Sequence, residues 1–349
     1  MNKLLARIRD WQHWPFLAFY APITYAWVWY YLKSRSLWFY TASNPTLAFG
    51  GFEGEGKSTM YQQLPPEFCP KSIFIDPSQS FEIVQKEIEE AHLPYPFIVK
   101  PDIGMKGILF RRIESAAQLK RYHEQMPARY IIQEFLNSRY EVGLFYYRMP
   151  DEERGTISAL LQKDLMELTG DGRSTLEQLI ASHPEAKNFM DTARQQGGDL
   201  NRVLSAGERY YLSHVANLCH GARFTDLHQE IDASLTALFD RISHQSQFFY
   251  GRYDIKCDAI DDLKQGRNFK ILEFNGAGSV PNHIYAGRYN LWQAYREILK
   301  HWKAMYEISA RNRRKGIAYW SFQRGRRFLK QSKRYFDKLK ELDKKLVLE

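Results

Sequence analysis

Two stretches, Arg-Tyr-Asp at residues 252–254 and Glu-Phe-Asn at residues 273–275, constrain this chain most, because both alternate polar and apolar side chains. Successive side chains of a strand point to opposite faces, so the polar members of each stretch share one face. Residues 259–268 between the stretches are polar and contain a glycine, a composition suited to returning the chain. We therefore expect an antiparallel hairpin with one polar face.

Such a hairpin would bring Arg252, Asp254, Glu273 and Asn275 together. Mg²⁺ prefers oxygen donors, takes one or two carboxylates from the protein, and completes its shell with water and substrate phosphates. Asp254, Glu273 and Asn275 offer two carboxylates and an amide, and so predict a magnesium site. The alternative is a hairpin whose acidic side chains are solvated surface groups.

A glycine-containing loop lies upstream between two expected strands, residues 96–101 and 108–113. The loop carries Gly104, Lys106 and Gly107, so its backbone amides and ammonium groups could cover a polyphosphate. The alternative is an ordinary α/β segment with a surface loop.

A helix and a third strand follow this loop. Ser115 with Gln118 is a capping-box signature for a helix that extends to about Gln125, and residues 130–136 return to a strand. The order is thus strand, glycine loop, strand, helix, strand.

This order and these residues resemble the ATP-grasp superfamily, and within it the D-alanine:D-alanine ligase-like carboxylate-amine ligases, over roughly residues 95–310. The resemblance implies an α/β (α+β) ATP-grasp fold that uses ATP and Mg²⁺. It implies that Arg252 is catalytic and that Asp254, Glu273 and Asn275 hold the metal. The nucleotide-binding residues that it implies are Lys100, Gly104, Lys106, Gly107, Gln133, Glu134, Phe135, Glu141 and Lys163.

Within that set, the resemblance implies that Lys100 and Lys163 contact phosphates, Glu134 lies beside the adenine and Glu141 binds the ribose. The implied reaction joins a carboxylate to an amine, or a similar nucleophile, through an acyl phosphate. Residues 276–283, which follow the Glu-x-Asn pair, match no substrate pattern, so both substrates stay open and are either small molecules or lipid-linked. A non-catalytic membrane-binding module with an ATP-grasp fold is a further alternative.

A rival signal is the P-loop pattern at residues 51–58, with Gly51, Gly56, Lys57 and Ser58 in register. A P-loop needs a buried strand before it and a helix behind it. Here only the short run 46–49 precedes it, and Pro65 and Pro66 stop any helix behind it within two turns. We therefore favour a glycine-rich turn near the substrate site, with ATP binding dependent on Lys100 and little on Lys57, over a P-loop nucleotidase.

The two ends of the chain predict membrane contact. Residues 15–32 carry no charge, and their length reaches the lower limit for a spanning helix. They include eight aromatic residues, and their Trp and Tyr content is typical of the membrane interface. A single span, a monotopic anchor and an aromatic helix packed on the protein all remain open. Residues 311–349 hold fourteen Lys and Arg against four Asp and Glu, with apolar residues near helical spacing, which predicts a basic amphipathic helix.

These features predict four segments and a location. We expect association with an anionic membrane on its cytoplasmic side and no nucleic-acid partner. Cys69, Cys219 and Cys257 lack metal-ligand spacing, so they indicate neither a zinc site nor a disulfide framework. The expected segments are a membrane-associated segment (1–45), an N-terminal subdomain (46–94), an ATP-grasp domain (95–310) and a basic tail (311–349).

Overall fold

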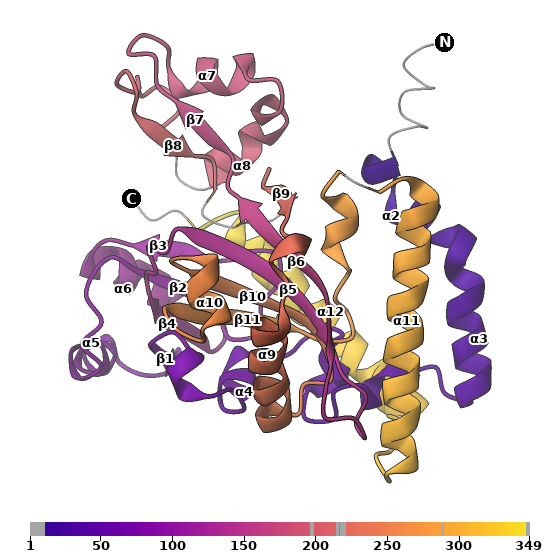
Figure 1. Cartoon of the computed structure of the whole chain (residues 1–349). Coiled ribbons are helices and arrows are strands. Elements are labelled where there is room, and N and C mark those ends of the chain that lie inside the picture. Colours follow the sequence, from indigo (N-terminus) through magenta and orange to yellow (C-terminus); the bar gives the residue numbers. More distant parts are fainter. Residues whose placement is uncertain (1–10, 196–198, 214–215, 217–220, 288, 347–349) are drawn as a thin grey trace.

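The computed structural model describes residues 11–346 except 196–198, 214–215, 217–220 and 288 (Figure 1). The strands are β1 (Ser72–Ile75), β2 (Phe97–Pro101), β3 (Arg111–Ile113), β4 (Tyr130–Glu134), β5 (Tyr140–Tyr147), β6 (Thr156–Asp164), β7 (Glu167–Thr169), β8 (Arg209–Tyr211), β9 (Arg223–Asp226), β10 (Tyr250–Cys257) and β11 (Phe269–Asn275). The α-helices are α2 (Phe16–Tyr20), α3 (Thr24–Ser34), α4 (Lys57–Tyr61), α5 (Phe81–Glu90), α6 (Ala116–Gln125), α7 (Leu176–Ser182), α8 (Met190–Gln195), α9 (Ala233–Ser246), α10 (Ile260–Lys264), α11 (Leu291–Arg314) and α12 (Phe322–Asp343). The 3₁₀ helices used below are η2 (Ala21–Ile23), η4 (Ala48–Gly51), η8 (His228–Glu230) and η9 (Asn282–Tyr285).

The described strands form three antiparallel sheets. Their orders are β1-β4-β2-β3, β11-β10-β5-β6-β9 and β7-β8. The expected mixture of helices with antiparallel sheets is confirmed. The hairpin of β10 and β11 is also present, and α10 lies in its connection.

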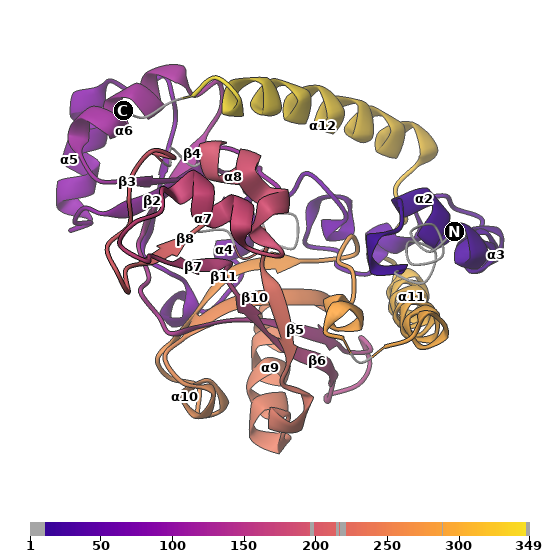
Figure 2. The ribbon, with the colours of Figure 1, turned by 90° about the horizontal axis from the view of Figure 1, so that it is seen from above.

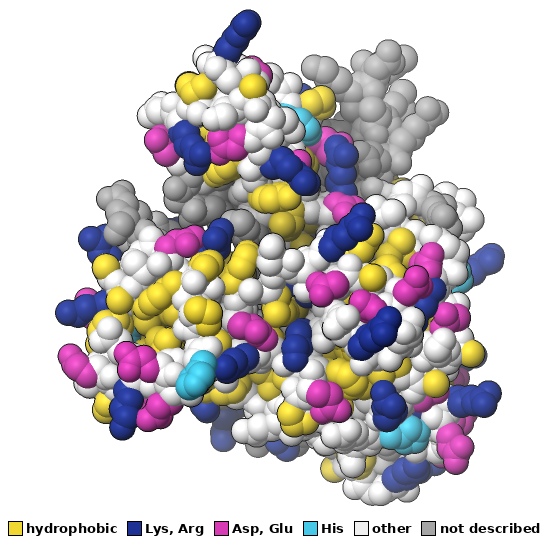
Figure 3. Space-filling view, turned by 60° about the vertical axis from the view of Figure 1, so that its left-hand side comes forward, with side chains coloured by type: hydrophobic (Ala, Val, Ile, Leu, Met, Phe, Trp, Pro, Cys, Tyr) yellow, Lys and Arg dark blue, Asp and Glu magenta, His cyan; other side chains and the backbone are white. Residues whose placement is uncertain are grey.

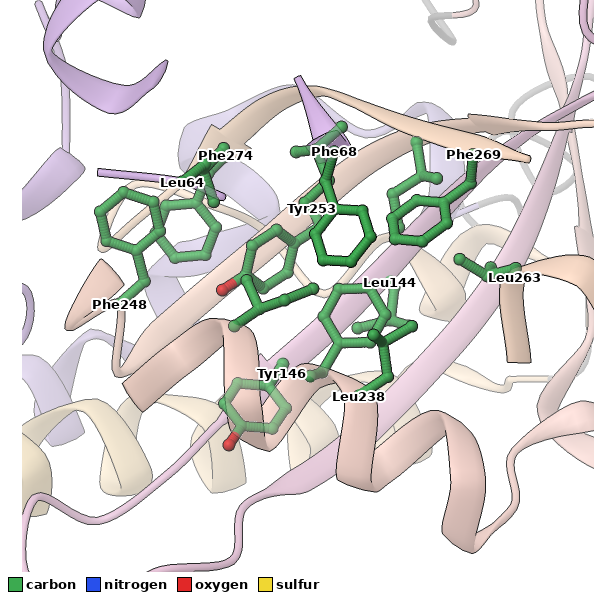
Figure 4. Packing of buried hydrophobic residues seen from close by; sticks show 14 of the residues in the cluster. Leu64, Phe68, Leu144, Tyr146, Leu238, Phe248, Tyr253, Leu263, Phe269 and Phe274 are labelled. Carbon is green, nitrogen blue, oxygen red and sulfur yellow. The ribbon is translucent and has the colours of Figure 1, made fainter. Parts of the chain in front are cut away.

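One face of the five-stranded sheet packs on α9 and α4. Phe274 of β11 stacks on Phe248 with ring centroids 4.4 Å apart, and Tyr253 of β10 packs against Phe274 at 4.6 Å (Figure 4). These side chains alternate with the polar residues of β10 and β11, so burying them turns the polar residues to the opposite face.

The four-stranded sheet is covered on one face by α5, α6 and α12. Phe97, Val99 and Ile132 are buried there together with Phe336 and Leu339 of α12. Figure 2 shows α12 running along one side of the molecule, from the neighbourhood of α2 and α3 to that of α6. The predicted basic amphipathic helix is therefore present, and its apolar face contacts the protein.

One local expectation was wrong. Residues 108–110 are not part of a strand, because the Leu109 N–H donates to Asp343 Oδ1 of α12 (2.9 Å) and Leu109 has a φ of 55°. The run 46–49, which is too short for the buried strand of a P-loop, ends in η4, which begins at Ala48. The helix predicted from Ser115 is α6, whose first turn is capped by the Ser115 hydroxyl.

The aromatic run 15–32 is divided into α2, η2 and α3, which lie along α11 at one side of the molecule (Figure 1). Trp27 packs against Trp302 at 5.1 Å and Tyr30 against Tyr306 at 4.7 Å. No helix among the described residues is both long and apolar enough to cross a membrane. Residues 1–10 of the expected membrane-associated segment lie outside the described residues.

A small lobe built from β7, β8, α7 and α8 projects from the end of β6 (Figure 1). Figure 3 shows this lobe above the body of the molecule, with basic and acidic side chains interspersed on that face. Cys69 and Cys257 are free thiols, and Cys219 lies outside the described residues.

The packing of α12 predicts a stability difference along one helix. Leu339→Ala is expected to lower the free energy of unfolding by about 2–5 kcal/mol, because Leu339 is fully buried. Lys338→Ala, at the exposed neighbouring position, should change it by less than about 0.5 kcal/mol. Urea denaturation checks both, and equal midpoints for the two variants would contradict the packing of α12.

Candidate active site

The polar faces of β10 and β11 meet as their alternation predicts. Arg252 pairs in register with Asn275, and Asp254 with Glu273. On the other side of β10, Asp254 pairs with Gly143 of β5. Gly143 lies against this face, since a Cβ there would be in van der Waals contact with Lys163 Cε (3.4 Å) and Arg252 Cδ (3.5 Å).

Asp254 is the centre of this polar face. Its carboxylate accepts hydrogen bonds from Arg252 Nε (2.8 Å) and Nη2 (3.1 Å), and Lys163 Nζ lies 2.9 Å away. Asn275 Nδ2 lies 3.3 Å from Oδ2. Burial opposes ionisation of Asp254, but the positive charges of Arg252 and Lys163 outweigh it and lower its pKa to about 2.

Lys100 of β2 approaches the same cluster from the four-stranded sheet. Its Nζ donates to Gln133 Oε1 of β4 at 3.0 Å. Burial, together with repulsion from Lys57, lowers the pKa of Lys100 to about 7, and Glu273 and Glu141 of the larger sheet partly oppose this shift. The two sheets therefore turn their charged faces toward each other.

Lys57 stands between the two sheets, at the start of α4. Its Nζ lies 3.6 Å from Glu273 Oε1 and donates to the Gly104 carbonyl at 3.4 Å. Tyr61 of the same helix donates to the Leu272 carbonyl (2.7 Å) and accepts from Gln133 Nε2 (2.9 Å). The helix thus bridges β11 and β4.

Two further acids border the cluster. Glu141 of β5 lies 3.4 Å from Lys163 Nζ, and burial raises its pKa. Glu55 is half-buried near Glu273, and both desolvation and that negative charge raise its pKa well above the ordinary value. Its Oε1 has no hydrogen-bond partner among the described residues.

The glycine-rich segment 51–58 reaches the cluster through a close backbone contact. Gly51 has a φ of 70°, and a Cβ there would lie 2.8 Å from Gly276 Cα. The amides of Ala277 and Gly278 donate to the carbonyls of Gly50 and Gly51 (3.0 and 3.2 Å). This segment therefore lies against the residues that follow the Glu-x-Asn pair, as the interpretation of a turn near the substrate site requires.

The geometry of a P-loop is absent from this segment. Before α4 stands η4, where a P-loop has a buried strand. The Asp102 carboxylate accepts from the Ser58 N–H (2.8 Å) and the Ser58 hydroxyl (2.7 Å), so an anionic side chain already occupies the first turn of α4.

The glycine loop of residues 102–110 is held from both sides. Asp102 binds Ser58 as described, and the Tyr335 hydroxyl of α12 donates to the Ile103 carbonyl at 2.9 Å. Asp343, also of α12, accepts from Arg111 Nη2 at 2.9 Å in addition to the Leu109 amide. The C-terminal helix thus fixes the loop that was predicted to cover phosphates.

The other predicted nucleotide residues lie around this loop and the end of β4. Glu134 accepts from the Lys71 N–H at 2.7 Å, and the Phe135 ring lies 4.7 Å from the Arg112 guanidinium. Lys106 is exposed, and Gly107 has a φ of 75°. Their roles toward adenine or phosphate stay predictions.

The side-chain oxygens of Asp254, Glu273 and Asn275 are donors of the kind that Mg²⁺ binds. Asp254 and Glu273 are register partners, and Asn275 contacts Asp254. Within the described residues, no group of three or more His, Cys, Asp or Glu side chains could hold a metal ion. Two carboxylates and an amide match an ion that takes its remaining ligands from phosphates and water.

Sequence reasoning missed Lys57, Lys256 and Glu55 as members of this site. Lys256 lies on the same face of β10 as Asp254, and its Nζ donates to the Leu136 carbonyl at 2.9 Å. Its place two residues after Asp254 in the strand was the signal for it. For Lys57 the signal was the glycine-rich motif itself, which brings a lysine to a helix start even where no P-loop forms.

No protein-family model matches this chain, and neither does any curated protein. Similar solved structures include the VanG D-Ala:D-Ser ligase from Enterococcus faecalis, at 14% identity and a TM-score of 0.42, covering 74% of this chain and 62% of that one. A bifunctional glutathione synthetase from Pasteurella multocida is similar at 15% identity and a TM-score of 0.40, covering 74% and 38%. The ATP-grasp ligase PsnB, complexed with a minimal precursor, is similar at 14% identity and a TM-score of 0.35, covering 67% and 55%.

The chain spans less than two thirds of the length of these three proteins.

The closeness of Lys57 and Lys100 can be measured through a pKa. Lys57→Met is expected to raise the pKa of Lys100 above about 7, because it removes a repulsion that disfavours the protonated form. Lys120→Met, at an exposed position on α6, should leave that pKa unchanged. Carbon-13 NMR titration of the lysine side chains, with the Lys100 signal assigned through Lys100→Arg, measures it. An unchanged Lys100 titration in Lys57→Met would show that the two ammonium groups are not neighbours.

Proposed function

We propose that this protein is an ATP-dependent ligase that joins a carboxylate to an amine or a similar nucleophile. The observation that carries the proposal is one buried cluster, between two antiparallel sheets, in which Lys57, Lys100, Lys163 and Arg252 surround Asp254 and Glu273. Clustered cations that converge from separate strands suit a polyphosphate, and paired carboxylates suit its metal ion.

Each side chain has a role in this proposal. Lys100 and Lys163 neutralise phosphate oxygens, and Lys57, which contacts the Gly104 carbonyl, joins them from the other side of the glycine loop. Asp254, Glu273 and Asn275 would hold Mg²⁺, which would supply charge neutralisation at the phosphates. Catalysis then consists of positioning and electrostatic stabilisation, and no protein nucleophile is needed.

The reaction has two displacements. A carboxylate oxygen of the first substrate attacks the γ-phosphorus, the bond to the β,γ-bridging oxygen breaks, and ADP leaves. Arg252 stabilises the negative charge that develops on the transferred group. The nucleophile then attacks the acyl carbon, the bond to the phosphate oxygen breaks, phosphate leaves, and the amine proton passes to a base.

A P-loop nucleotidase is the rival function, and Asp102 argues against it. A P-loop cradles phosphates with backbone amides at the helix start, but here the Ser58 N–H donates to the Asp102 carboxylate. A phosphate at that position would meet a negative charge.

Nucleotide affinity tests the proposal. Lys100→Ala and Lys57→Ala are each expected to weaken ATP binding roughly tenfold or more, because a charge-assisted bond to phosphate contributes about 1.5–3 kcal/mol. This revises the expectation from sequence that Lys57 matters little, because Lys57 lies in the same cluster. Calorimetric dissociation constants in the presence of Mg²⁺ measure both losses, and Lys120→Ala is the matched control.

The two functions give different patterns in that experiment. A large loss for Lys57→Ala with none for Lys100→Ala would support a P-loop nucleotidase and overturn the ligase. Unchanged affinity in both variants, or no ATP binding by the intact protein, would support the non-catalytic module.

We also propose that the enzyme works at the cytoplasmic side of an anionic membrane. Helices α2 and α3 expose a group of apolar side chains, called here the aromatic surface. Lys33, Arg35, Lys300 and Lys303 are exposed nearby on α3, its C-cap and α11. Aromatic side chains suit the lipid interface, and each basic residue near an anionic leaflet contributes about 1 kcal/mol. The aromatic surface comprises Phe16, Leu17, Tyr25, Val28, Trp29, Tyr31 and Leu32.

Co-flotation with vesicles that contain phosphatidylserine checks this location. Replacing Trp29 and Leu32 by Ser should lower binding at both low and high salt, because apolar contacts are not screened. Replacing Lys33 and Lys303 by Gln should lower it mainly at low salt. Ile83→Ser, at an exposed apolar position on α5, is the control. An intact protein that stays unbound at low salt would contradict the proposal.

Deleting residues 311–349 is a poor test of the basic tail. It would also remove Phe336 and Leu339 from the protein core.

A further inference from the structure

A polar cavity of about 480 Å³ lies between β6, β9 and the beginning of α11. We call it the head cavity. It is large enough for a small organic ligand, since such sites measure roughly 300–1,000 Å³. The residues that line it, polar or charged except for one alanine, are Ser158, Ala159, Asp226, His228, His283, Tyr289, Gln293, Arg296, Glu297 and Lys300.

His283 is the residue that marks the cavity as a binding site. Its side chain is only 4% exposed, yet neither ring nitrogen has a hydrogen-bond partner among the described residues. Its Nε2 lies 3.6 Å from Glu297 Oε2, beyond hydrogen-bond distance. Buried polar groups are almost always paired, so a ligand group in the cavity would satisfy a side chain that is otherwise costly to bury.

The head cavity lies close to the charged cluster around Asp254. His283 follows Asn282 at the start of η9. When the Asn282 amide is oriented so that both of its ends have partners, its oxygen accepts from Arg252 Nη1 at 2.7 Å. One residue thus separates the cavity from the arginine proposed to stabilise the reacting group.

The cavity is lined by two cations, Arg296 and Lys300, together with two acids, Asp226 and Glu297, so its cations can receive the carboxylate of a polar head. Glu297 already lies near Lys300 (3.8 Å) as well as His283. Arg296, by contrast, forms no ion pair with any described residue and lines the cavity. A guanidinium on the cavity wall is a natural partner for a carboxylate.

A second hollow, of about 620 Å³, lies between α3 and α11, and we call it the chain groove. Its walls include Tyr25, Trp29 and Leu299, and Lys303 lies at its edge. Lys300 lines both the chain groove and the head cavity. A polar hollow beside the reacting centre therefore adjoins an aromatic hollow on the proposed membrane-facing surface.

We propose that the carboxylate substrate is a single-chain amphiphile, with its polar head in the head cavity and its hydrocarbon chain in the chain groove. This inference rests on the proposed ligase function. The head carboxylate points toward Arg252, the rest of the polar head contacts His283 and Arg296, and the chain passes Lys300. A head whose carboxylate pairs with cations suits the polar head cavity, and a hydrocarbon chain suits the aromatic walls of the chain groove.

Direct binding of N-acylglycines tests this inference without any need for ATP. Acetyl, hexanoyl, octanoyl and decanoyl glycine, each below its micelle concentration, are titrated into the full-length protein by calorimetry. We expect affinity to rise about twofold to fourfold for each added methylene over this series. The lower figure corresponds to partial burial of the methylene in the chain groove, at roughly twofold, and the upper figure to full burial. Exchanging Tyr25 and Trp29 for Ser should abolish this rise, and both positions are exposed, so the fold is preserved.

One variant tests the contribution of the head cavity alone, and a second serves as the control. His283→Phe should weaken binding of every member by a similar factor and leave the chain-length dependence intact. Trp292→Ser, at an exposed aromatic position on α11 outside both hollows, should change nothing. Affinity independent of chain length, dependence that survives the exchange of Tyr25 and Trp29, or no binding of any member would each overturn the proposal.

The proposed function fails separately from this inference. ATP dissociation constants measured on the same variants should match those of the unchanged protein. If the intact protein bound no ATP while the chain-length dependence was present, the ligase would be overturned and the amphiphile site retained.

Discussion

The charged site depends on how Asp254 is paired. Removing a carboxylate and its counter-ions from water costs several kcal/mol for each ion unless close partners replace the hydration. The Asp254 carboxylate is contacted by Arg252 of its own strand, Lys163 of β6 and Asn275 of β11. The register of β10 with β5 and β11 places these partners around Asp254, so the geometry of the site depends on the pairing of the strands.

That register follows from the opposite face of the same strands. Tyr253 and Phe274 are buried against α9 and Phe248, and a slip of one residue would carry them to the charged face. The apolar alternation in the sequence therefore predicted the hairpin and the shared face of Arg252 and Asp254. Cross-strand partners within a hairpin are local, which is why this part of the site could be predicted from the sequence.

The rest of the site could not be predicted in this way, because it depends on contacts between distant segments. Lys57 lies near Glu273 only because Gly51 packs on Gly276 and Ser58 binds Asp102. The amphipathic pattern of α12 predicted a helix with one apolar face but not what covers that face. Leu109 illustrates the consequence, because its amide bonds to Asp343 of α12 where the sequence predicted a strand.

The cluster also explains why Lys100 has a lowered pKa. Lys163 and Arg252 are matched by Asp254 and Glu141, and Lys57 by Glu273, which leaves Lys100 with an amide as its direct partner. Burial and Lys57 then favour its neutral form. A polyphosphate between the sheets would supply the missing negative charge and favour the protonated form of Lys100. A half-buried lysine that bonds directly to an amide is thus a favourable position for the anionic ligand that the proposed function requires.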